Sequence, residues 1–367
     1  MSGSGPVGIG IIGAGVISDT YIENLASFAD TRVLAVGDLR PEVARAKAAE
    51  HGVPSAGEVD VVLDHPDVEI VVNLTIPAAH AEVAERAIAA GKHVWNEKPL
   101  ALDRASGRAV LDRAAAAGLR VGCAPDTFLG SGLQAARRLI EAGAIGEPLT
   151  AVAILQSSGP DAWHPNPAFL FQVGGGPLFD IGPYFLTALV QVLGSVSSVA
   201  GAVSTARDQR TIGKGPRAGE VFDVTVASQS SALVRFDGGP SAHAIFSFDS
   251  ALPRFVLEVT GRDATMILPD PNNFDGEIGI RRRDAKATET VEHTTARSTR
   301  GTGVLEMARA IREDRAHRAD GALAYHVLDV MTAIGESAAA EAFVQVESRT
   351  VVAPLLPDDW DPLARTV

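Results

Sequence analysis

Cysteine is nearly absent from this sequence, which contains one, Cys123, among its 367 residues. A single cysteine cannot form an intrachain disulfide, and it cannot supply the thiolate cluster of a structural zinc or iron–sulfur centre. This scarcity is typical of a protein that stays in a reducing cytoplasm. The sequence therefore predicts a cytoplasmic protein with no metal site.

Positive charge is also scarce, because the formal net charge is -13. Nucleic acids and anionic membranes bind basic surfaces, and the one arginine run, residues 281–283, is too short to provide one. The N-terminus lacks a basic region, and the first apolar run, residues 7–12, is too short for a signal or membrane helix. We expect neither nucleic acid nor a membrane as a partner.

Apolar residues make up 46% of the chain, which suits a globular protein of two domains. Up to residue 126, apolar runs alternate with alanine-rich helical patterns, and this alternation predicts an α/β fold with a doubly wound parallel sheet. The expected strands are 6–12, 32–37, 69–75 and 119–124, and the expected helices include 77–90 and 102–117, the latter opened by Asp103.

After Asp126 the alternating runs lack regular helices between them, which predicts a large, mostly antiparallel sheet with one open face. The expected strands are 149–156, 220–229, 232–236, 242–248, 255–268 and 348–353, and the expected helices are 132–142, 304–315 and 322–340. We therefore divide the chain into domains 1–126 and 127–367.

The first apolar run leads into Gly13-Ala14-Gly15-Val16-Ile17-Ser18 and then into a helical pattern. In this context the first glycine permits a tight turn, the second lets the backbone approach a pyrophosphate, and the helix N-terminus attracts the anion. Gly13, Gly15, Val16 and Ile17 are therefore predicted to bind a dinucleotide. Ser18 replaces the third glycine, so we expect a slight spreading between helix and strand there.

Asp38 ends the second strand 23 residues after Gly15, close to the spacing of roughly 20 residues expected for a ribose-binding acid. A carboxylate accepts from both ribose hydroxyls and repels a 2′-phosphate, which favours NAD over NADP. Arg40 keeps NADP open, since a guanidinium near that ribose could accept the phosphate. Alternatively, Asp38 simply begins the turn before Pro41.

The strand 69–75 stops at Thr75, followed by Pro77 and, one helical turn later, His80. These three residues are predicted to face the nicotinamide end of the cofactor. His80 is equally well explained as a histidine on a helix surface.

Glu97-Lys98-Pro99 joins the end of a short strand to the start of a helix, the place where open α/β sheets bind ligands. Only five of the 32 basic residues are lysines, so a lysine here departs from the preference of the chain for arginine. Lys98 is the first candidate for catalysis, with Glu97 beside the cofactor. The alternative is a surface ion pair between Glu97 and Lys98, which contributes little to stability.

Asp180 and Tyr184 follow a glycine-rich loop, residues 174–176, and their spacing of four would place them on one face of a helix. Gly182 and Pro183 weaken or kink that helix where the pair lies. A carboxylate and a phenol could thus converge on one substrate. The alternative is a helix-capping acid and a core aromatic residue.

Three further residues are candidates for substrate contact. Trp163 and His164 lie in a proline-stiffened loop, where the indole could stack on a sugar ring and the imidazole could bind a hydroxyl. A loop tryptophan more often serves packing than recognition. Asp126 follows the end of the strand 119–124, at the edge where ligands bind.

Taken together, Gly13-Ala14-Gly15, Asp38, the stretch from residue 90 to Pro99, and residues 174–176 with Asp180 resemble the glucose-fructose oxidoreductase, inositol dehydrogenase and MocA family. The resemblance covers nearly the whole chain. It implies an NAD(P)-binding Rossmann domain, a substrate-binding and oligomerisation domain, and oxidation or reduction of sugars, cyclitols or related alcohols. It also implies a homodimer or homotetramer formed through the open sheet.

In that family the lysine matching Lys98 touches both the reacting hydroxyl and the nicotinamide, and its bond to the following proline is often cis. Many members have a histidine where Tyr184 stands, which puts an inositol dehydrogenase assignment in doubt. Residues 124–128 also differ from the pattern of many relatives, so the substrate pocket is expected to be distinctive.

For alcohol oxidation, a base must take the hydroxyl proton as hydride leaves. Tyr184 is the candidate, although an isolated phenol near pKa ~10 is a poor base unless an ammonium such as that of Lys98 favours the phenolate. Asp180 would hold Lys98 or a substrate hydroxyl, and His164 is the rival proton acceptor. Rival functions are an NAD-dependent glycosidase that oxidises its sugar transiently, a carbonyl or dihydrodiol reductase, and a non-catalytic NAD-binding regulator.

Overall fold

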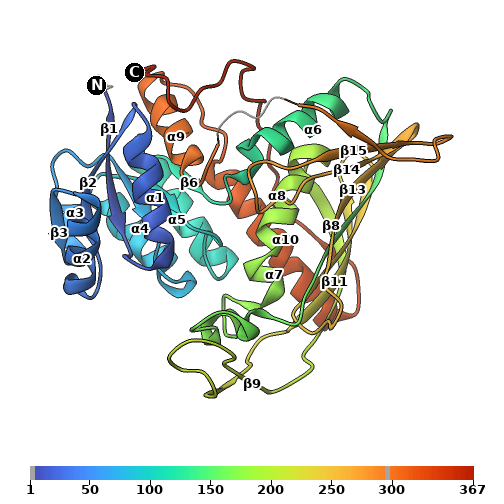
Figure 1. Ribbon diagram of the computed structural model, residues 1–367, viewed down its shortest axis with the longest axis horizontal. Coiled ribbons are helices and arrows are strands. Elements are labelled where there is room, and N and C mark those ends of the chain that lie inside the picture. Colours follow the sequence, from blue (N-terminus) through green and yellow to red (C-terminus); the bar gives the residue numbers. More distant parts are fainter. Residues whose placement is uncertain (1–4, 294–297) are drawn as a thin grey trace. The chain divides into compact units, whose positions relative to one another are not determined.

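The computed structural model describes residues 5–293 and 298–367, which form two compact units (Figure 1). Unit 1 comprises Met1–Gly130, Ala296–Tyr325 and Leu356–Val367, and unit 2 comprises Ser131–Thr295 and His326–Leu355. The expected division at residue 126 lies close to the first boundary, but two later segments return to unit 1. One reason is the buried carboxylate of Asp30, which binds the guanidinium of Arg309 at 2.7 Å and the backbone N–H of Thr366 at 3.0 Å.

Unit 1 contains a six-stranded sheet of order β3-β2-β1-β4-β5-β6, in which all neighbouring strands are parallel. The strands are β1 (Val7–Ile12), β2 (Thr31–Gly37), β3 (Ser55–Gly57), β4 (Ile70–Asn73), β5 (His93–Asn96) and β6 (Val121–Cys123). Every residue of β1 is buried, as expected for a central parallel strand covered on both faces. The chain moves outward from β1 to β3 and then restarts at β4, so the strand order switches between β1 and β4.

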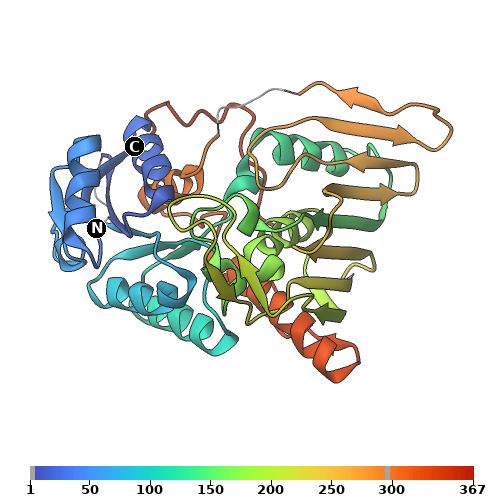
Figure 2. The same cartoon turned by 60° about the horizontal axis from the view of Figure 1, so that its bottom comes forward.

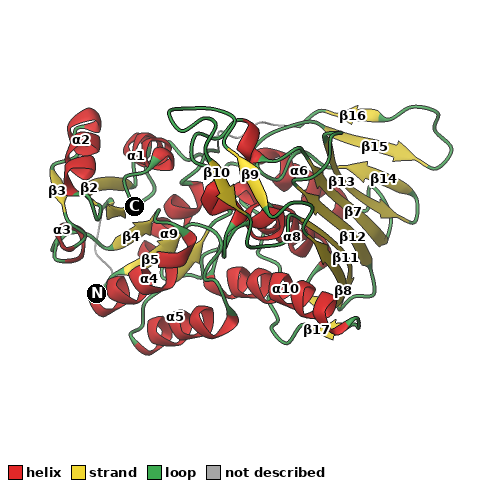
Figure 3. Cartoon of the chain, turned by 90° about the horizontal axis from the view of Figure 1, so that it is seen from below, coloured by secondary structure: helices red, strands yellow, loops and turns green. Residues whose placement is uncertain are grey.

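Helices cover both faces of this sheet, and the predicted doubly wound parallel fold is confirmed (Figure 3). On one face α3 (Asp60–Leu63), α4 (His80–Ala89) and α5 (Arg104–Ala116) pack into one apolar core with the strands. On the other face lie α1 (Val16–Ser27), α2 (Pro41–His51) and α9 (Thr302–Arg312), where Leu25 of α1 adjoins Gly301 before α9.

Local sequence accounts for where several of these helices begin and end. The side chain of Asp103 accepts the backbone N–H of Ser106 at 2.8 Å, which caps α5 as predicted. Pro41 occupies the first turn of α2, and Gly52 ends that helix with a left-handed φ of 69°.

Unit 2 contains a nine-stranded sheet of order β16-β15-β14-β13-β7-β12-β11-β8-β17 (Figure 2). The strands are β7 (Pro148–Gln156), β8 (Val196–Ser204), β11 (Gln229–Phe236), β12 (Ser241–Ser247), β13 (Arg254–Gly261), β14 (Ala264–Ile267), β15 (Ile278–Arg282), β16 (Glu289–Val291) and β17 (Val344–Gln345). Strands β7 and β12 are parallel and the other neighbours are antiparallel, so the predicted mostly antiparallel sheet is confirmed.

Helices α6 (Ser131–Glu141), α8 (Gly182–Leu193) and α10 (Gly321–Ala340) lie along one face of this sheet (Figures 1 and 3). Burial alternates along β11, where Ser230, Ala232, Val234 and Phe236 are buried and the residues between them are not. The opposite face carries no helix of the described residues, in agreement with the predicted open face. No helix in the described ranges is long and apolar enough to span a bilayer.

Three strand predictions in unit 2 are corrected. The expected strand 220–229 is replaced by the short β10 (Val221–Asp223), which pairs with β9 (Gln209–Thr211) in a separate ribbon, while Gln229 begins β11. The run 255–268 is two strands, β13 and β14. Residues 348–353 form no strand, because side chains bind their backbone N–H groups: Asp329 binds Ser348, Ser195 binds Thr350 and Gln191 binds Ala353.

Candidate functional site

The glycine loop after β1 lies where the strand order switches, the position at which doubly wound sheets bind dinucleotides. Gly13 has a φ of 103°, and a Cβ there would come within 2.7 Å of the carbonyl of Leu74, so only glycine fits. At Gly15, by contrast, an added Cβ would meet no atom within 4 Å. This open space beside the N-terminus of α1 suits a pyrophosphate.

The first residues of α1 complete this loop. Val16 is 89% exposed at the helix start, and Ile17 follows it half-buried. Ser18 is buried in place of the third glycine of the fingerprint, and its hydroxyl donates to the carbonyl of Gly15 at 2.6 Å. The serine thus adds a hydrogen bond within the loop at the position where the sequence suggested only a looser packing.

Asp38 lies at the end of β2 and is bound to the glycine loop. One carboxylate oxygen accepts the N–H of Ala14 at 2.8 Å, and the other accepts the N–H of Arg40 at 2.9 Å. The residue therefore shapes the turn before Pro41 and also places its negative charge beside the loop. Arg40 is exposed at the N-terminus of α2.

His80 is buried, with 1% of its surface exposed, so the alternative of a helix-surface histidine is wrong. Its Nδ1 lies 2.6 Å from the carbonyl oxygen of Pro99, and its Nε2 lies 3.0 Å from that of Thr75. Burial lowers the pKa of His80, which favours a neutral ring that donates to one of these carbonyls. His80 therefore links the Lys98 turn, through Pro99, to Thr75 of the predicted cofactor-binding segment.

Glu97 and Lys98 follow β5 in a half-buried setting that differs from an exposed surface pair. One carboxylate oxygen of Glu97 accepts the Tyr21 hydroxyl at 2.8 Å, and the other accepts the backbone N–H of Lys98 at 3.1 Å. The Lys98-Pro99 peptide bond is cis, as the resemblance implied. The turn that carries Lys98 is thus held by Glu97 on one side and by His80 on the other.

Asp126 does not meet the expectation of a substrate contact. Its side chain is fully buried, and one carboxylate oxygen accepts the N–H groups of Gly301 at 3.0 Å and Gly303 at 2.9 Å. These bonds cap the N-terminus of α9, and burial raises the pKa of Asp126 to about 6. The preceding Ala124-Pro125 bond is also cis, which the sequence analysis did not predict.

In unit 2, Asp180 and Tyr184 belong to two helices. The helix α7 (Gly176–Asp180) ends at Asp180, Ile181 interrupts it, and α8 begins at Gly182. The predicted weakening at Gly182 and Pro183 is confirmed as a break, so the expectation of a single helical face is corrected. Asp180 is half-buried, and Tyr184 is buried with 7% of its surface exposed.

Trp163 is 63% exposed and lines the same cavity as Asp180. The volume of this cavity is about 440 Å³. The structure thus brings two of the predicted substrate residues together. His164 lies edge-on to Trp163 and to Phe169, and its Nδ1 accepts the N–H of Asn166 at 3.0 Å. Neither His164 nor Tyr184 is among the residues that line this cavity.

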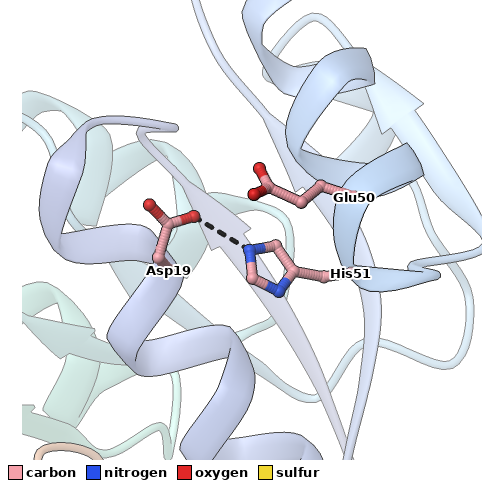
Figure 4. Close-up of side chains that lie close together, drawn as sticks. All are labelled: Asp19, Glu50 and His51. Atoms are coloured by element: carbon pink, nitrogen blue, oxygen red, sulfur yellow. Dashed lines mark hydrogen bonds and ion pairs between the residues drawn. The ribbon is translucent and has the colours of Figure 1, made fainter.

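A separate cluster of charged side chains joins α1 to α2 (Figure 4). In the described part of the chain it is the one group in which at least three potential metal ligands converge: Asp19, Glu50 and His51. His51 lies 2.9 Å from Asp19, and the ammonium of Lys47 contacts both Asp19 and Glu50. Because Lys47 already balances the carboxylates, we interpret this group as an ion-pair cluster.

Comparison with known families decides the assignment. Residues 7–124 match the model of the GFO/IDH/MocA oxidoreductase family with an NAD-binding Rossmann fold, and residues 133–267 match the C-terminal domain of the same family. The chain belongs to the GFO/IDH/MocA family. The cofactor-binding half is therefore an NAD-binding Rossmann domain, consistent with the space at Gly15 and the carboxylate of Asp38.

Two curated relatives are similar over part of the chain. The dTDP-3,4-didehydro-2,6-dideoxy-alpha-D-glucose 3-reductase of Streptomyces violaceoruber is 34% identical over 201 residues, 53% of this chain and 57% of that protein. An inositol 2-dehydrogenase of Gluconacetobacter diazotrophicus is 33% identical over 148 residues, 39% of this chain and 44% of that protein. The similarity thus spans about half the length of these relatives.

Two solved structures share the fold. Apo levoglucosan dehydrogenase has a TM-score of 0.82 at 23% identity, covering 95% of this chain and 100% of its own. An NAD binding oxidoreductase from Klebsiella pneumoniae has a TM-score of 0.81 at 22% identity, covering 94% of this chain and 99% of its own.

The sequence analysis missed several residues that shape the site of this family member. Asn73 and Asn96 end β4 and β5, and the Asn73 amide donates to the Asn96 side chain at 2.9 Å and to the His80 carbonyl at 3.0 Å. Tyr21 binds Glu97 from α1. The asparagines carried a signal, since each is a polar residue that ends an apolar strand. Tyr21 carried none, because its role depends on a contact 76 residues away.

Proposed function

We propose that this chain transfers a hydride between a secondary alcohol of a sugar, glycoside or cyclitol and the nicotinamide of NAD. The observation that carries the proposal is the Lys98 turn, fixed by Glu97 and His80 at the carboxyl edge of the sheet that also presents the loop of Gly13 and Gly15. The substrates named for the relatives, a dideoxy sugar nucleotide and inositol, support a carbohydrate-like alcohol.

For the cofactor, Gly13, Gly15, Val16 and Ile17 would hold the pyrophosphate, while Thr75 and Pro77 would face the nicotinamide end with Lys98. The carboxylate of Asp38 favours a free ribose 2′-hydroxyl, and therefore NAD over NADP. NAD, when bound, supplies the hydride acceptor.

The residues of the chain handle the proton. We assign to Tyr184 the removal of the hydroxyl proton, and to the Lys98 ammonium the stabilisation of the negative charge that develops on the oxygen. Asp180 would hold Lys98 or a substrate hydroxyl. His164 is the rival proton acceptor, and the backbone N–H of Asn166 binds its Nδ1.

The test is the absorbance of reduced nicotinamide at 340 nm when the purified protein is mixed with NAD, or NADP, and a panel of monosaccharides, glycosides and cyclitols. Net NADH formation with at least one of them is the expected result. Release of aglycone without net NADH would instead establish a glycosidase with transient oxidation. Oxidation of added NADH by a ketone or aldehyde would identify the reductive direction, and cofactor binding without any turnover would favour a regulator.

We further propose that copies of this chain assemble as a homodimer or homotetramer in the cytoplasm through the open face of the nine-stranded sheet. Half-buried apolar side chains alternate with the buried helix-facing ones along its central strands, namely Val152, Ile154, Leu233, Ile245 and Val256. An apolar face of this kind is typical of a subunit interface. Light scattering after size-exclusion chromatography tests this, with Leu233→Lys expected to yield monomers.

A further inference from the structure

The cavity lined by both Asp180 and Trp163 is mainly apolar. It lies within unit 2, where β7 ends and β13 begins, and its volume is about 440 Å³. Seven of its eleven lining residues are apolar or aromatic, and they include Trp163, Phe255, Phe248 and Ile181. Asp180 is the one carboxylate among the eleven.

The walls of this cavity are held in place by buried contacts. The Phe248 ring packs against Phe171 with a centroid distance of 5.6 Å, and the Phe255 ring packs against Phe185 at 5.4 Å. The buried guanidinium of Arg210 donates to the carbonyls of Ser158 at 2.9 Å and Phe248 at 2.7 Å. The loop before Trp163 and the end of β12 are therefore fixed to one another, and the cavity is preformed.

Three of the four polar side chains on the walls, those of Gln156, Ser157 and Arg254, already make hydrogen bonds within the protein. The side chain of Arg254 donates to that of Gln156 at 2.9 Å, and the Ser157 hydroxyl accepts the N–H of Gly159 at 3.3 Å. A bare monosaccharide or cyclitol carries a hydroxyl on nearly every carbon, and each buried hydroxyl requires a hydrogen-bond partner. These walls suit an apolar group better than a polyol.

Aromatic surface is exposed around the same cavity. Trp163 is 63% exposed and Phe255 is 41% exposed, although large aromatic side chains are normally buried. Two exposed rings beside an apolar cavity are typical of a binding site for a flat or aliphatic ligand.

We propose that the substrate is a glycoside whose apolar aglycone, an aryl or alkyl group, occupies this cavity while its sugar lies at Asp180. This inference rests on the proposed function, since it extends the same substrate site. Trp163 and Phe255 then select between substrates by the aglycone, and Asp180 and Tyr184 act on the sugar.

The test compares matched methyl and phenyl glycosides of glucose, galactose and xylose, in both anomeric forms. Their binding to the NAD-loaded protein is measured by isothermal titration calorimetry, and their turnover is measured by NADH absorbance. We expect the phenyl member of at least one pair to bind more tightly by roughly 10-fold or more, since a hydrophobic pocket discriminates by this order. Phe255→Ala and Trp163→Ala should each remove most of this preference.

Phe343→Ala is the matched control, because Phe343 is a 44% exposed phenylalanine that does not line the cavity. The preference for the phenyl glycoside should persist in this variant. Absence of a phenyl preference in every pair, or a preference that both cavity variants retain, overturns the proposal. A phenyl preference in binding without NADH formation would support the cavity while contradicting the proposed dehydrogenase. NADH formation without any phenyl preference would support the dehydrogenase and contradict the proposal for the cavity.

Discussion

The His80 ring lies 2.6 Å from the carbonyl oxygen of Pro99, nineteen residues further along the chain. This contact joins the start of α4 to the turn that carries Lys98, and it is fully buried. Lys98 therefore takes its position from a side chain that does not itself reach the surface. The catalytic role proposed for Lys98 requires its placement within a fraction of an ångström, so the contact is expected to control the reaction rate.

Replacing His80 should lower turnover more than cofactor binding. We expect His80→Ala to lower kcat by about 10- to 100-fold, because Lys98 loses its support. Loss of the buried hydrogen bond should also cost about 1–3 kcal/mol of stability. In His80→Asn the side-chain amide can donate to the Pro99 carbonyl in place of the imidazole, so this variant should recover part of both losses. Steady-state kinetics and urea unfolding of both variants test this, and equal kcat in the two would contradict a positioning role.

Lys98→Met should abolish turnover and leave NAD binding nearly intact. The thioether keeps the length of the side chain but removes the ammonium, so we expect a drop in kcat of about 10³-fold. Fluorescence titration with NAD and NADH formation measure the two effects. Lys286→Met, at an exposed position, is the matched control. Loss of NAD binding with the loss of turnover would indicate that Lys98 is structural.

Tyr184→Phe should remove the proton acceptor while keeping the buried ring in place. We expect kcat to fall by about 10²- to 10⁴-fold, the usual contribution of a general base. His164→Ala should retain most of the activity. A pH–rate profile of each variant decides between them, because only the variant that lacks the base loses the limb of the profile that reports its titration. Full activity in Tyr184→Phe would transfer the proton role to His164 or Asp180.

Asp38→Ser should shift the cofactor preference toward NADP. The change removes the negative charge that repels a 2′-phosphate, and a serine hydroxyl can still bind the N–H of Ala14. We expect kcat/KM with NAD to fall by about 10-fold or more and the NADP to NAD ratio to rise by a similar factor. Adding Arg40→Ala should cancel the gain with NADP. An unchanged ratio would show that Asp38 serves only the turn.

Acid should destabilise the fold through His326. Its Nε2 accepts the N–H of Val196 at 2.9 Å, and burial lowers its pKa to about 4 from the ordinary 6.5. Between those values the unfolded chain binds the proton and the folded chain does not, so stability falls as pH falls through this window. The loss is on the order of 3 kcal/mol for one such ring.

Urea unfolding at several pH values between 7 and 4 measures this loss. His326→Gln should flatten the pH dependence, whereas the exposed His243→Gln should leave it unchanged. His93 adds to the same slope, because its Nδ1 accepts the N–H of Arg120 at 2.9 Å and burial lowers its pKa to about 4. A pH dependence that is identical in the wild type and in His326→Gln would contradict the assignment.

The sequence by itself determined the parallel and antiparallel sheets, the glycine turn at Gly13 and Gly15, and the break near Gly182. These features are local: strand and helix periods are repeated every few residues, and the conformational limits of glycine and proline act at the residue itself. Asp38 and Lys98 could be found for the same reason, since each follows closely after a strand that the local pattern marks.

The tertiary structure alone decided which side chains those local elements would meet. His80 and Asp126 are polar residues of a kind usually found at the surface or in a substrate site. In the structure, His80 supports the Lys98 turn, and Asp126 caps a helix 175 residues away. The strand-like residues 348–353 instead bind the side chains of Asp329 in α10, Gln191 in α8 and Ser195, which lies between α8 and β8. Burial and hydrogen-bond partners depend on distant segments that pack together, and no short window of sequence contains both partners.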